Sequence, residues 1–294
     1  MAAVGIGFKT SPQDVDWATL DATWALAGEL DVFDSAWMND HLTDLSPSGG
    51  PSFESLTLAA ALAHRVPGKW VGHAVLSNTF RHPAMVAKAA TVMDHVTGGR
   101  FILGLGAGWH EGEHRAFGIE LPPVRERIDR LGSALEVIAA LFSPAASRPP
   151  GVTREDPFYP LERAINLPAP LTAGGPPIWL GGQKRRGIAL AARFGQGWLL
   201  PGVNAGDVGY FREKRDAIRR ALAAARRDPD AFAFAGQVSV GEGEAAQRTA
   251  REASIELVRA GATHVIVGIR PSGGPAALAD AAEHVAAPLR DAVA

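Results

Sequence analysis

Hydrophobic and polar positions along the chain follow two alternating periods. Short runs rich in β-branched and aromatic residues are typical of strands, and the longer segments between them repeat apolar residues every three or four positions, as amphipathic helices do. Strands are predicted at residues 4–8, 35–39, 70–76, 101–106, 178–180, 197–200, 232–240 and 264–269. Helices are predicted at residues 16–30, 53–65, 83–96, 124–142, 185–194, 207–226, 244–260 and 275–293.

The order of these elements indicates the fold class. Strands that alternate with helices form a parallel sheet, and eight such units in about 250 residues close a (β/α)8 TIM barrel. An open doubly wound sheet is the alternative, but it normally has fewer strands. Residues 143–177 interrupt the alternation of strands and helices after the fourth helix. They are rich in Pro and Gly, with one strand-like stretch around 159–167. We expect one barrel domain over residues 1–294, with an insertion at about 143–177.

Composition narrows the class of protein. The chain has no cysteine, which excludes disulfides, thiolate zinc sites and cysteine nucleophiles. A formal net charge of −2 gives no basic surface for nucleic acid or anionic lipid. No apolar run approaches the roughly 18 residues of a membrane-spanning helix, and no charged-then-apolar leader precedes the strand that begins at Val4. We expect a cytoplasmic protein that binds neither nucleic acid nor membrane and acts on a small molecule.

Polar residues follow several predicted strands, at the end of the barrel where active sites lie. Lys9 follows the first strand, and Asp40 and His41 follow the second. A carboxylate beside an imidazole can orient the ring and exchange a proton near neutral pH. A capped loop with a solvent-facing histidine is the alternative. Arg81 precedes the proline that opens the third helix, and the sequence identifies no partner for it.

Two glycine-containing motifs point to ligand binding. Gly104, Gly106 and Gly108 allow a backbone to approach a planar or phosphorylated ligand closely, although a tight turn alone explains them too. Gly181 and Gly182 precede Gln183 and three cations in the first turn of a helix, Lys184, Arg185 and Arg186. Cations oppose the helix dipole there. Together with free backbone N–H groups they predict a phosphate site, with a solvated basic turn as the alternative.

Residues 110–114 match the zinc pattern H-E-x-x-H. That chemistry needs both histidines on one face of a stable helix, but this stretch follows a glycine loop and has Gly112 at its centre. Acidic residues in a first helical turn explain Glu111 and Glu113 more simply. We predict no metal site.

Five stretches at or near the predicted strand ends occur in a fixed order: 33–41, 75–83, 94–100, 104–111 and 177–182. Together they resemble signatures of the bacterial luciferase-like superfamily of flavin- and F420-dependent oxidoreductases. The resemblance runs from about Val4 to Pro201. It implies a barrel that binds coenzyme F420, or alternatively FMN, at the carboxyl ends of its strands.

The resemblance also implies roles for particular residues. Asp40 would contact the coenzyme and His41 would transfer a proton. A cis peptide at Ala74–Val75 would support the coenzyme ring. Further coenzyme contacts are expected at the remaining matched or glycine-rich positions, which are Ser77, Gly106, Ala107, Gly108, Gly181, Gly182, Gln183 and Arg185.

One departure from the family pattern concerns the substrate. The sugar-phosphate dehydrogenases of the superfamily carry a glutamate acid/base where this chain has Trp109, and their phosphate-binding cations have no clear counterpart here. We therefore expect an aromatic or apolar substrate beside Trp109. Because the superfamily often forms dimers, a homodimer is also expected.

Three functions are compatible with these residues. The first is an F420-dependent oxidoreductase that transfers a hydride between the deazaflavin and an organic substrate, with His41 handling the proton. The second is an FMN-dependent luciferase-like monooxygenase. The third is a flavin-binding barrel without turnover, which the complete set of eight units and the Asp40–His41 pair argue against.

Overall fold

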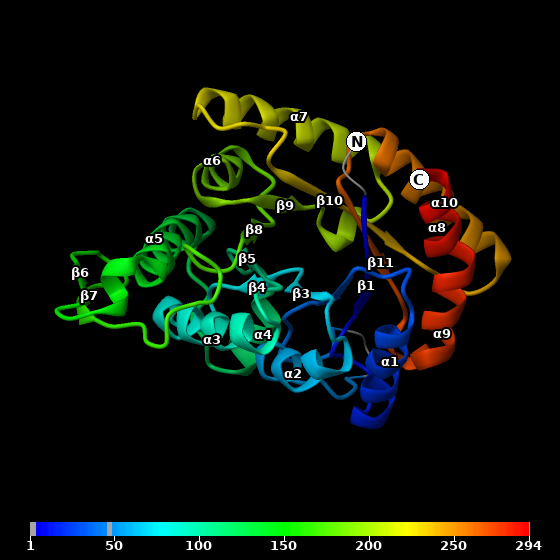
Figure 1. Ribbon diagram of the computed structural model, residues 1–294, viewed down its shortest axis with the longest axis horizontal. Coiled ribbons are helices and arrows are strands. Elements are labelled where there is room, and N and C mark those ends of the chain that lie inside the picture. Colours follow the sequence, from blue (N-terminus) through cyan, green and yellow to red (C-terminus); the bar gives the residue numbers. More distant parts are fainter. Residues whose placement is uncertain (1–3, 46–48, 294) are drawn as a thin grey trace.

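Eight parallel strands close into a barrel (Figure 1). The computed structural model describes residues 4–45 and 49–293. Residues 1–3, 46–48 and 294 of the predicted domain lie outside the described residues, as does the segment before Val4 for which no leader was expected. The strands are β1 Gly5–Thr10, β2 Ser35–Met38, β3 Trp70–His73 continued by β4 Leu76–Ser77, β5 Phe101–Gly106, β8 Ile178–Leu180, β9 Gly197–Leu199, β10 Ala233–Ser239 and β11 His264–Gly268. Pairing of β3 with β5 completes the ring, so the predicted TIM barrel is confirmed.

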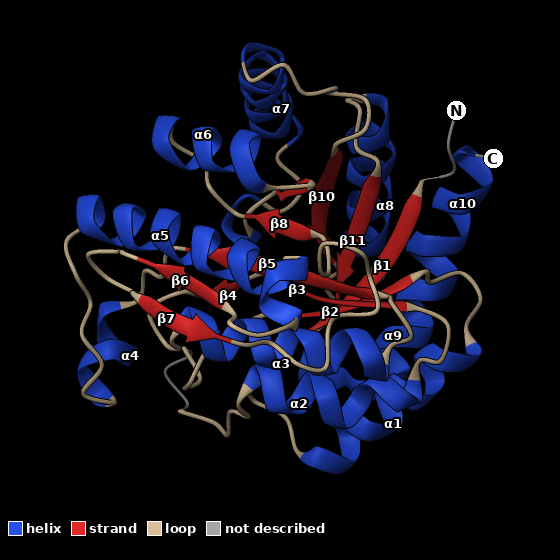
Figure 2. Cartoon of the chain, turned by 60° about the vertical axis from the view of Figure 1, so that its left-hand side comes forward, coloured by secondary structure: helices blue, strands red, loops and turns tan. Residues whose placement is uncertain are grey.

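Helices surround the strands (Figure 2). They are α1 Trp17–Glu29, α2 Ser55–Leu62, α3 Pro83–Val96, α4 Glu111–Ala116, α5 Val124–Phe142, α6 Arg185–Phe194, α7 Val208–Ala224, α8 Glu244–Arg259, α9 Gly274–Ala281 and α10 Ala287–Val293. The predicted helices are present, but the last is divided by a π-helical turn at Ala282–Ala286. The short α4 was not among the helices predicted by range, although Glu111 and Glu113 were interpreted as residues of a first helical turn. In the described part of the chain, no helix is long and apolar enough to cross a bilayer.

The insertion after α5 forms an antiparallel hairpin of β6 Val152–Arg154 and β7 Leu161–Ala164. The strand-like stretch around 159–167 corresponds to β7, whereas β6 was not predicted. Figure 1 places the hairpin beside α5, away from β1 and β11. The segment after it attaches to α3, where Lys88 Nζ donates to the carbonyl of Leu167 at 2.8 Å.

Two tryptophans fill the inside of the barrel. Trp37 and Trp179 lie with ring centroids 5.3 Å apart, in a cluster of buried side chains separate from the larger core between strands and helices. Glycines on neighbouring strands make room for them. A Cβ on Gly72 would lie 2.5 Å from the Trp37 ring, and one on Gly197 would lie 2.7 Å from the Trp179 ring. Because the interior is packed, a ligand site has to lie at the rim.

Candidate functional site

The third barrel strand is interrupted at the rim, between β3 and β4. The peptide bond Ala74–Val75 is cis, as the family resemblance predicted. The Val75 side chain occupies space that neighbouring glycines leave free, because a Cβ on Gly106 would lie 2.8 Å from it and one on Gly181 would lie 3.4 Å from it. Four of the predicted coenzyme-binding residues, from three strands, therefore meet at one place on the rim.

The loop after β5 approaches the end of β4. Gly108 has φ +80°, and a Cβ there would lie 2.3 Å from Thr79 Oγ1 and 2.7 Å from Ser77 Oγ. Glycine is therefore required at this position for both its backbone conformation and its lack of a side chain. The hydroxyls of Ser77 and Thr79 lie 2.7 Å apart.

A chain of hydrogen bonds leads from Ser77 to His114 on α4. His114 Nδ1 lies 2.7 Å from the carbonyl oxygen of His110, so Nδ1 carries a hydrogen. In the neutral ring Nε2 then accepts the hydroxyl hydrogen of Thr79, 2.7 Å away. Thr79 accepts in turn from Ser77, which leaves the lone pairs of the Ser77 hydroxyl for a ligand at the rim.

Asp40 is buried in an ion-pair network with Arg81 and Glu54. Arg81 donates to both carboxylate oxygens of Asp40, at 2.7 and 2.8 Å, and the backbone N–H of Ser77 donates to Oδ2 at 2.8 Å. Arg81 also pairs with Glu54, the N-cap of α2. Burial lowers the pKa of Arg81, but the bonds from both carboxylates outweigh it, so the pKa is raised. Asp40 therefore joins β2 to β4 and α3.

His41 is held by Glu113 of α4, and not by its neighbour Asp40. His41 Nδ1 lies 2.8 Å from Glu113 Oε2, and Glu113 Oε1 accepts the backbone N–H groups of Leu42 at 2.6 Å and Thr43 at 3.3 Å. Burial raises the pKa of Glu113, but these hydrogen bonds lower it more, so its pKa lies below the usual range. Glu113 is therefore ionised at neutral pH, and its carboxylate accepts the hydrogen that His41 carries on Nδ1.

The interpretation of Glu113 as a first-turn acid is confirmed, since it lies in the first turn of α4, but its side chain has a second role. Its side chain is only 1% exposed and points into the site. The motif H-E-x-x-H also does not act as a unit, since His110 Nδ1 accepts the backbone N–H of Glu113 at 3.1 Å while His114 faces Thr79. No group of three or more metal-ligating side chains occurs within residues 4–45 and 49–293.

Trp109 lies beside the imidazole of His41. Their ring centroids are 5.9 Å apart and the rings are perpendicular, and Trp109 is 61% exposed. An exposed indole next to His41, the predicted proton-transfer residue, is unusual for a packing residue. The position of Trp109 favours the prediction that its side chain lines a substrate pocket, which stays a prediction.

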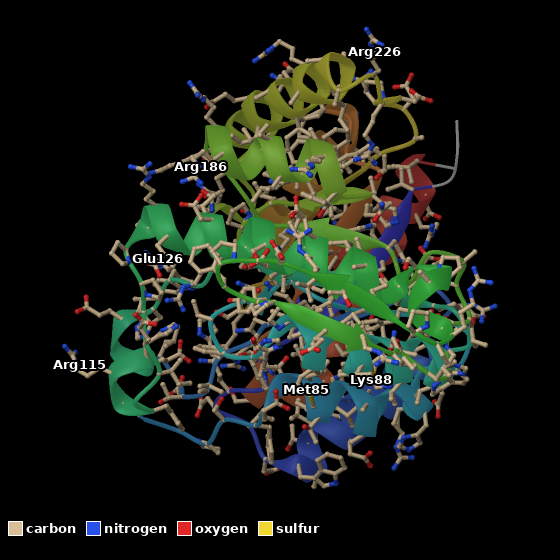
Figure 3. All side chains as sticks on the ribbon, turned by 90° about the vertical axis from the view of Figure 1, so that its left-hand side faces the viewer. Met85, Lys88, Arg115, Glu126, Arg186 and Arg226 are labelled. Carbon is tan, nitrogen blue, oxygen red and sulfur yellow. The ribbon has the colours of Figure 1, made fainter. Side chains whose placement is uncertain are left out.

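The residues of the predicted phosphate site lie at the start of α6, and their binding role stays a prediction. Lys184 is the N-cap of α6 and makes no side-chain cap, and both it and Arg185 are exposed. Arg186 instead pairs with Asp129 of α5. Figure 3 shows Arg186 on the outer surface of the molecule. Gln183 Oε1 accepts the hydroxyl of Tyr210 at 2.5 Å. A Cβ on Gly182 would lie 2.8 Å from the backbone of Gly187, so this glycine allows α6 to begin directly at the strand end.

Sequence reasoning missed the residues that organise these contacts. Glu113 could be noticed in the sequence because it lies three residues after His110, which follows the glycine loop at the end of a strand. Its partner His41, however, lies 72 positions away. Arg81 was noted without a partner, and its partner Asp40 lies 41 positions away. Neither pairing has a local signal, since only closure of the barrel brings the strand ends together.

Comparison with known proteins identifies the family. The luciferase-like monooxygenase family model matches residues 15–290. An F420-dependent glucose-6-phosphate dehydrogenase of Kribbella flavida is 31% identical over 244 residues, which are 78% of this chain and 71% of the relative. A phthiodiolone/phenolphthiodiolone dimycocerosates ketoreductase of Mycobacterium tuberculosis is 29% identical over 214 residues, 67% of this chain, and the chain spans about half the length of that relative, 54%.

The fold has matches among solved structures. An F420-dependent secondary alcohol dehydrogenase, solved in complex with an F420-acetone adduct, superposes with a TM-score of 0.78 over 99% of both chains at 18% identity. Such a likeness supports the barrel, while the family follows from the sequence matches. The chain belongs to the luciferase-like monooxygenase family.

Proposed function

We propose that this protein is an F420-dependent oxidoreductase that transfers a hydride between the deazaflavin and an organic substrate. The observation that carries the proposal is the His41–Glu113 pair at the rim of the barrel. The F420 dependence printed for the relative of 31% identity supports the choice of coenzyme.

The residues at the rim fit a coenzyme with a flat ring and an anionic tail. Val75 and Ala74 form an apolar surface among strand-end glycines, and the hydroxyl of Ser77 offers lone pairs for a ring N–H. Ala107 and Gly108 lie on the same loop. The uncapped first turn of α6, with Gly182, Gln183 and Arg185, would hold the anionic tail.

When bound, the coenzyme supplies a hydride acceptor or donor at its C5 carbon. The protein's part concerns the proton. In alcohol oxidation His41 Nε2 would accept the hydroxyl hydrogen of the substrate as a proton, while the bound coenzyme would supply the acceptor for the hydride from the same carbon. Glu113 keeps the other hydrogen on Nδ1 and stabilises the imidazolium that forms. Carbonyl reduction is the same sequence reversed, with His41 as proton donor.

Coenzyme titration tests the proposal. Oxidised F420 and FMN are added separately to the purified protein, and binding is measured by coenzyme fluorescence. F420 is expected to bind saturably, and Lys184→Gln combined with Arg185→Gln is expected to weaken it about tenfold, since each charged hydrogen bond contributes about 1.5–3 kcal/mol before solvent screening. Arg193→Gln, in the last turn of α6, is the matched control and should leave binding unchanged.

Other outcomes of the titration have definite meanings. Binding of neither coenzyme contradicts the proposal. Preferential FMN binding with oxygen uptake favours the luciferase-like monooxygenase function that the family name describes. Tight F420 binding without turnover of any secondary alcohol or ketone, unchanged by His41→Ala, favours a flavin-binding barrel without catalysis.

We further propose that the chain works as a homodimer, as one barrel domain over residues 1–294 with the insertion 143–177, in the cytoplasm. The support for dimerisation is an exposed apolar stripe on α3 made of Met85, Val92 and Val96, next to exposed Leu167. Figure 3 shows Met85 and Lys88 on this face. The absence of cysteine agrees with a reducing compartment.

Light scattering tests the dimer. The wild-type chain is expected at twice its mass of 30.9 kDa, and Val92→Glu should shift it to the monomer because a charge is then buried in the interface. Val124→Glu, which alters a similarly exposed valine on α5, should not. A monomeric wild type at high micromolar concentration would contradict the proposal.

A further inference from the structure

Lys9 ends the inward-facing row of β1 at the rim of the barrel. Residues of a strand alternate between two faces, and Gly5, Gly7 and Lys9 share the face that contacts the barrel interior, where a Cβ on Gly7 would lie 2.6 Å from Trp37 Nε1. The two residues that precede Lys9 in this row are glycines, because tryptophan side chains fill the barrel interior there. Lys9 is therefore the first side chain of β1 that reaches inward, and it does so at the level where the loops after the strands begin.

The ammonium of Lys9 is half-buried and has a neutral partner. Its Nζ donates to Gln237 Oε1 of β10 at 2.6 Å. Gln237 is oriented by its own amide, which donates to the carbonyl of Leu200, so the oxygen faces the lysine. Within residues 4–45 and 49–293, the Lys9 ammonium makes no other hydrogen bond and no ion pair. Two of its three N–H donors are therefore free.

Three neighbours of Lys9 in the described part of the chain are uncharged. Trp37 of β2 is its neighbour in register, Gly268 of β11 would place a Cβ 3.7 Å from Lys9 Cε, and Gly202 after β9 would place one 3.6 Å from Nζ. The glycines leave the ammonium without a covering side chain on these two sides. The charges at neighbouring strand ends have other partners, since Asp40 pairs with Arg81 and Arg270 pairs with Glu242.

A partly buried cation without a counter-ion loses part of its hydration and is destabilising by itself. Burial lowers the pKa of Lys9 to about 8, so the amine is still mainly protonated at neutral pH. An amide–amide or apolar contact would join β1 to β10 without this loss of hydration. The charge is therefore better explained by a ligand that supplies the missing anion.

We propose that Lys9 determines substrate specificity by binding a carboxylate of the substrate. This inference rests on the proposed function and makes its substrate class more definite: a hydroxy acid or keto acid whose aromatic or apolar body lies beside Trp109 and whose carboxylate meets Lys9. Lys9 lies near the carboxyl end of β1 and His41 follows β2, and these two strands are neighbours in the barrel. Because these strands are neighbours, one small molecule can place its carboxylate at Lys9 and the adjacent reacting carbon at His41.

A matched pair of ligands tests the inference. Benzoylformate and acetophenone differ by a carboxylate in place of a methyl group, so their affinities for the coenzyme-loaded protein, measured by calorimetry at pH 7, isolate the charge. The wild type is expected to prefer benzoylformate by about 10- to 100-fold, the range of a charged hydrogen bond. Lys9→Met should abolish this preference without weakening acetophenone binding, and Lys9→Arg should keep part of it.

Two further measurements separate a charge effect from a folding effect. Lys69→Met is the matched control, because Lys69 is another half-buried lysine but donates to the carbonyls of Leu30 and Phe33, before β3 begins. Gln237→Glu gives Lys9 a counter-ion within the protein and should reduce the preference as Lys9→Met does. Between pH 7 and 9 the wild-type preference should fall as the lysine loses its proton, and that change should be absent in Lys9→Met.

The inference is overturned if the wild type shows no preference for benzoylformate, or if Lys9→Met retains it. It is also overturned if Lys9→Met changes coenzyme affinity and leaves ligand discrimination intact, since Lys9 would then contact the coenzyme. Failure of the proposed function is recognised separately, by absence of coenzyme binding in the wild type before any ligand is added.

Discussion

Replacing Glu113 by glutamine is expected to lower turnover by about 10²–10⁴-fold, the usual contribution of general acid–base catalysis, while coenzyme affinity stays within a factor of two or three. The carboxylate accepts from His41 Nδ1 and from two backbone N–H groups. An amide in its place can keep the backbone bonds only by turning its NH2 toward His41. That favours the tautomer with hydrogen on Nε2, which cannot accept the proton of an alcohol.

The measurement is steady-state turnover of the best secondary alcohol in a panel, with the oxidised coenzyme followed by its visible absorbance. His41→Ala should lose as much activity as Glu113→Gln, and the double variant little more, because the two side chains act as one unit. Glu111→Gln is the matched control, since Glu111 lies in the same turn of α4 but is exposed. A Glu113→Gln variant with nearly wild-type turnover would show that Glu113 does not set the tautomer of His41.

Replacing Asp40 by asparagine is expected to destabilise the protein by about 3 kcal/mol. Its carboxylate is fully buried and receives two hydrogen bonds from Arg81, and removing one partner of a buried pair leaves the other charge uncompensated, which costs about 3–5 kcal/mol. Glu54 remains beside Arg81, so the effect should fall at the lower end of that range.

Urea denaturation measures this effect, and the exposed pair of Asp21 and Arg65 is the matched control. Arg65 also binds its aspartate through two nitrogens, at 2.7 and 2.6 Å, but both side chains are partly solvated. Asp21→Asn is therefore expected to cost about 0–1 kcal/mol. If Asp40→Asn instead leaves stability unchanged and mainly weakens coenzyme binding, Asp40 contacts the coenzyme directly, as the family resemblance implied.

Local patterns were sufficient to predict the barrel. The period of apolar residues along a strand or helix depends on side chains a few positions apart, so the elements could be located without knowledge of their packing. Pro83 indicated the start of α3 correctly, because its fixed φ suits a first turn. The irregular elements were missed for the same reason. The six residues of α4 and the three of β6 are too short to repeat a period.

The sequence also indicated where chemistry would lie, because parallel strands of a barrel end on one side and the polar residues after each strand must meet there. Which of these residues bind one another depended on the tertiary structure. His41 pairs with Glu113 across 72 positions and Lys9 with Gln237 across 228. Such contacts are set by the register between strands and by the path of the loops, which involve the whole chain, so no neighbouring pattern of residues encodes them. Asp40, adjacent to His41 in sequence, consequently turned out to bind Arg81 instead.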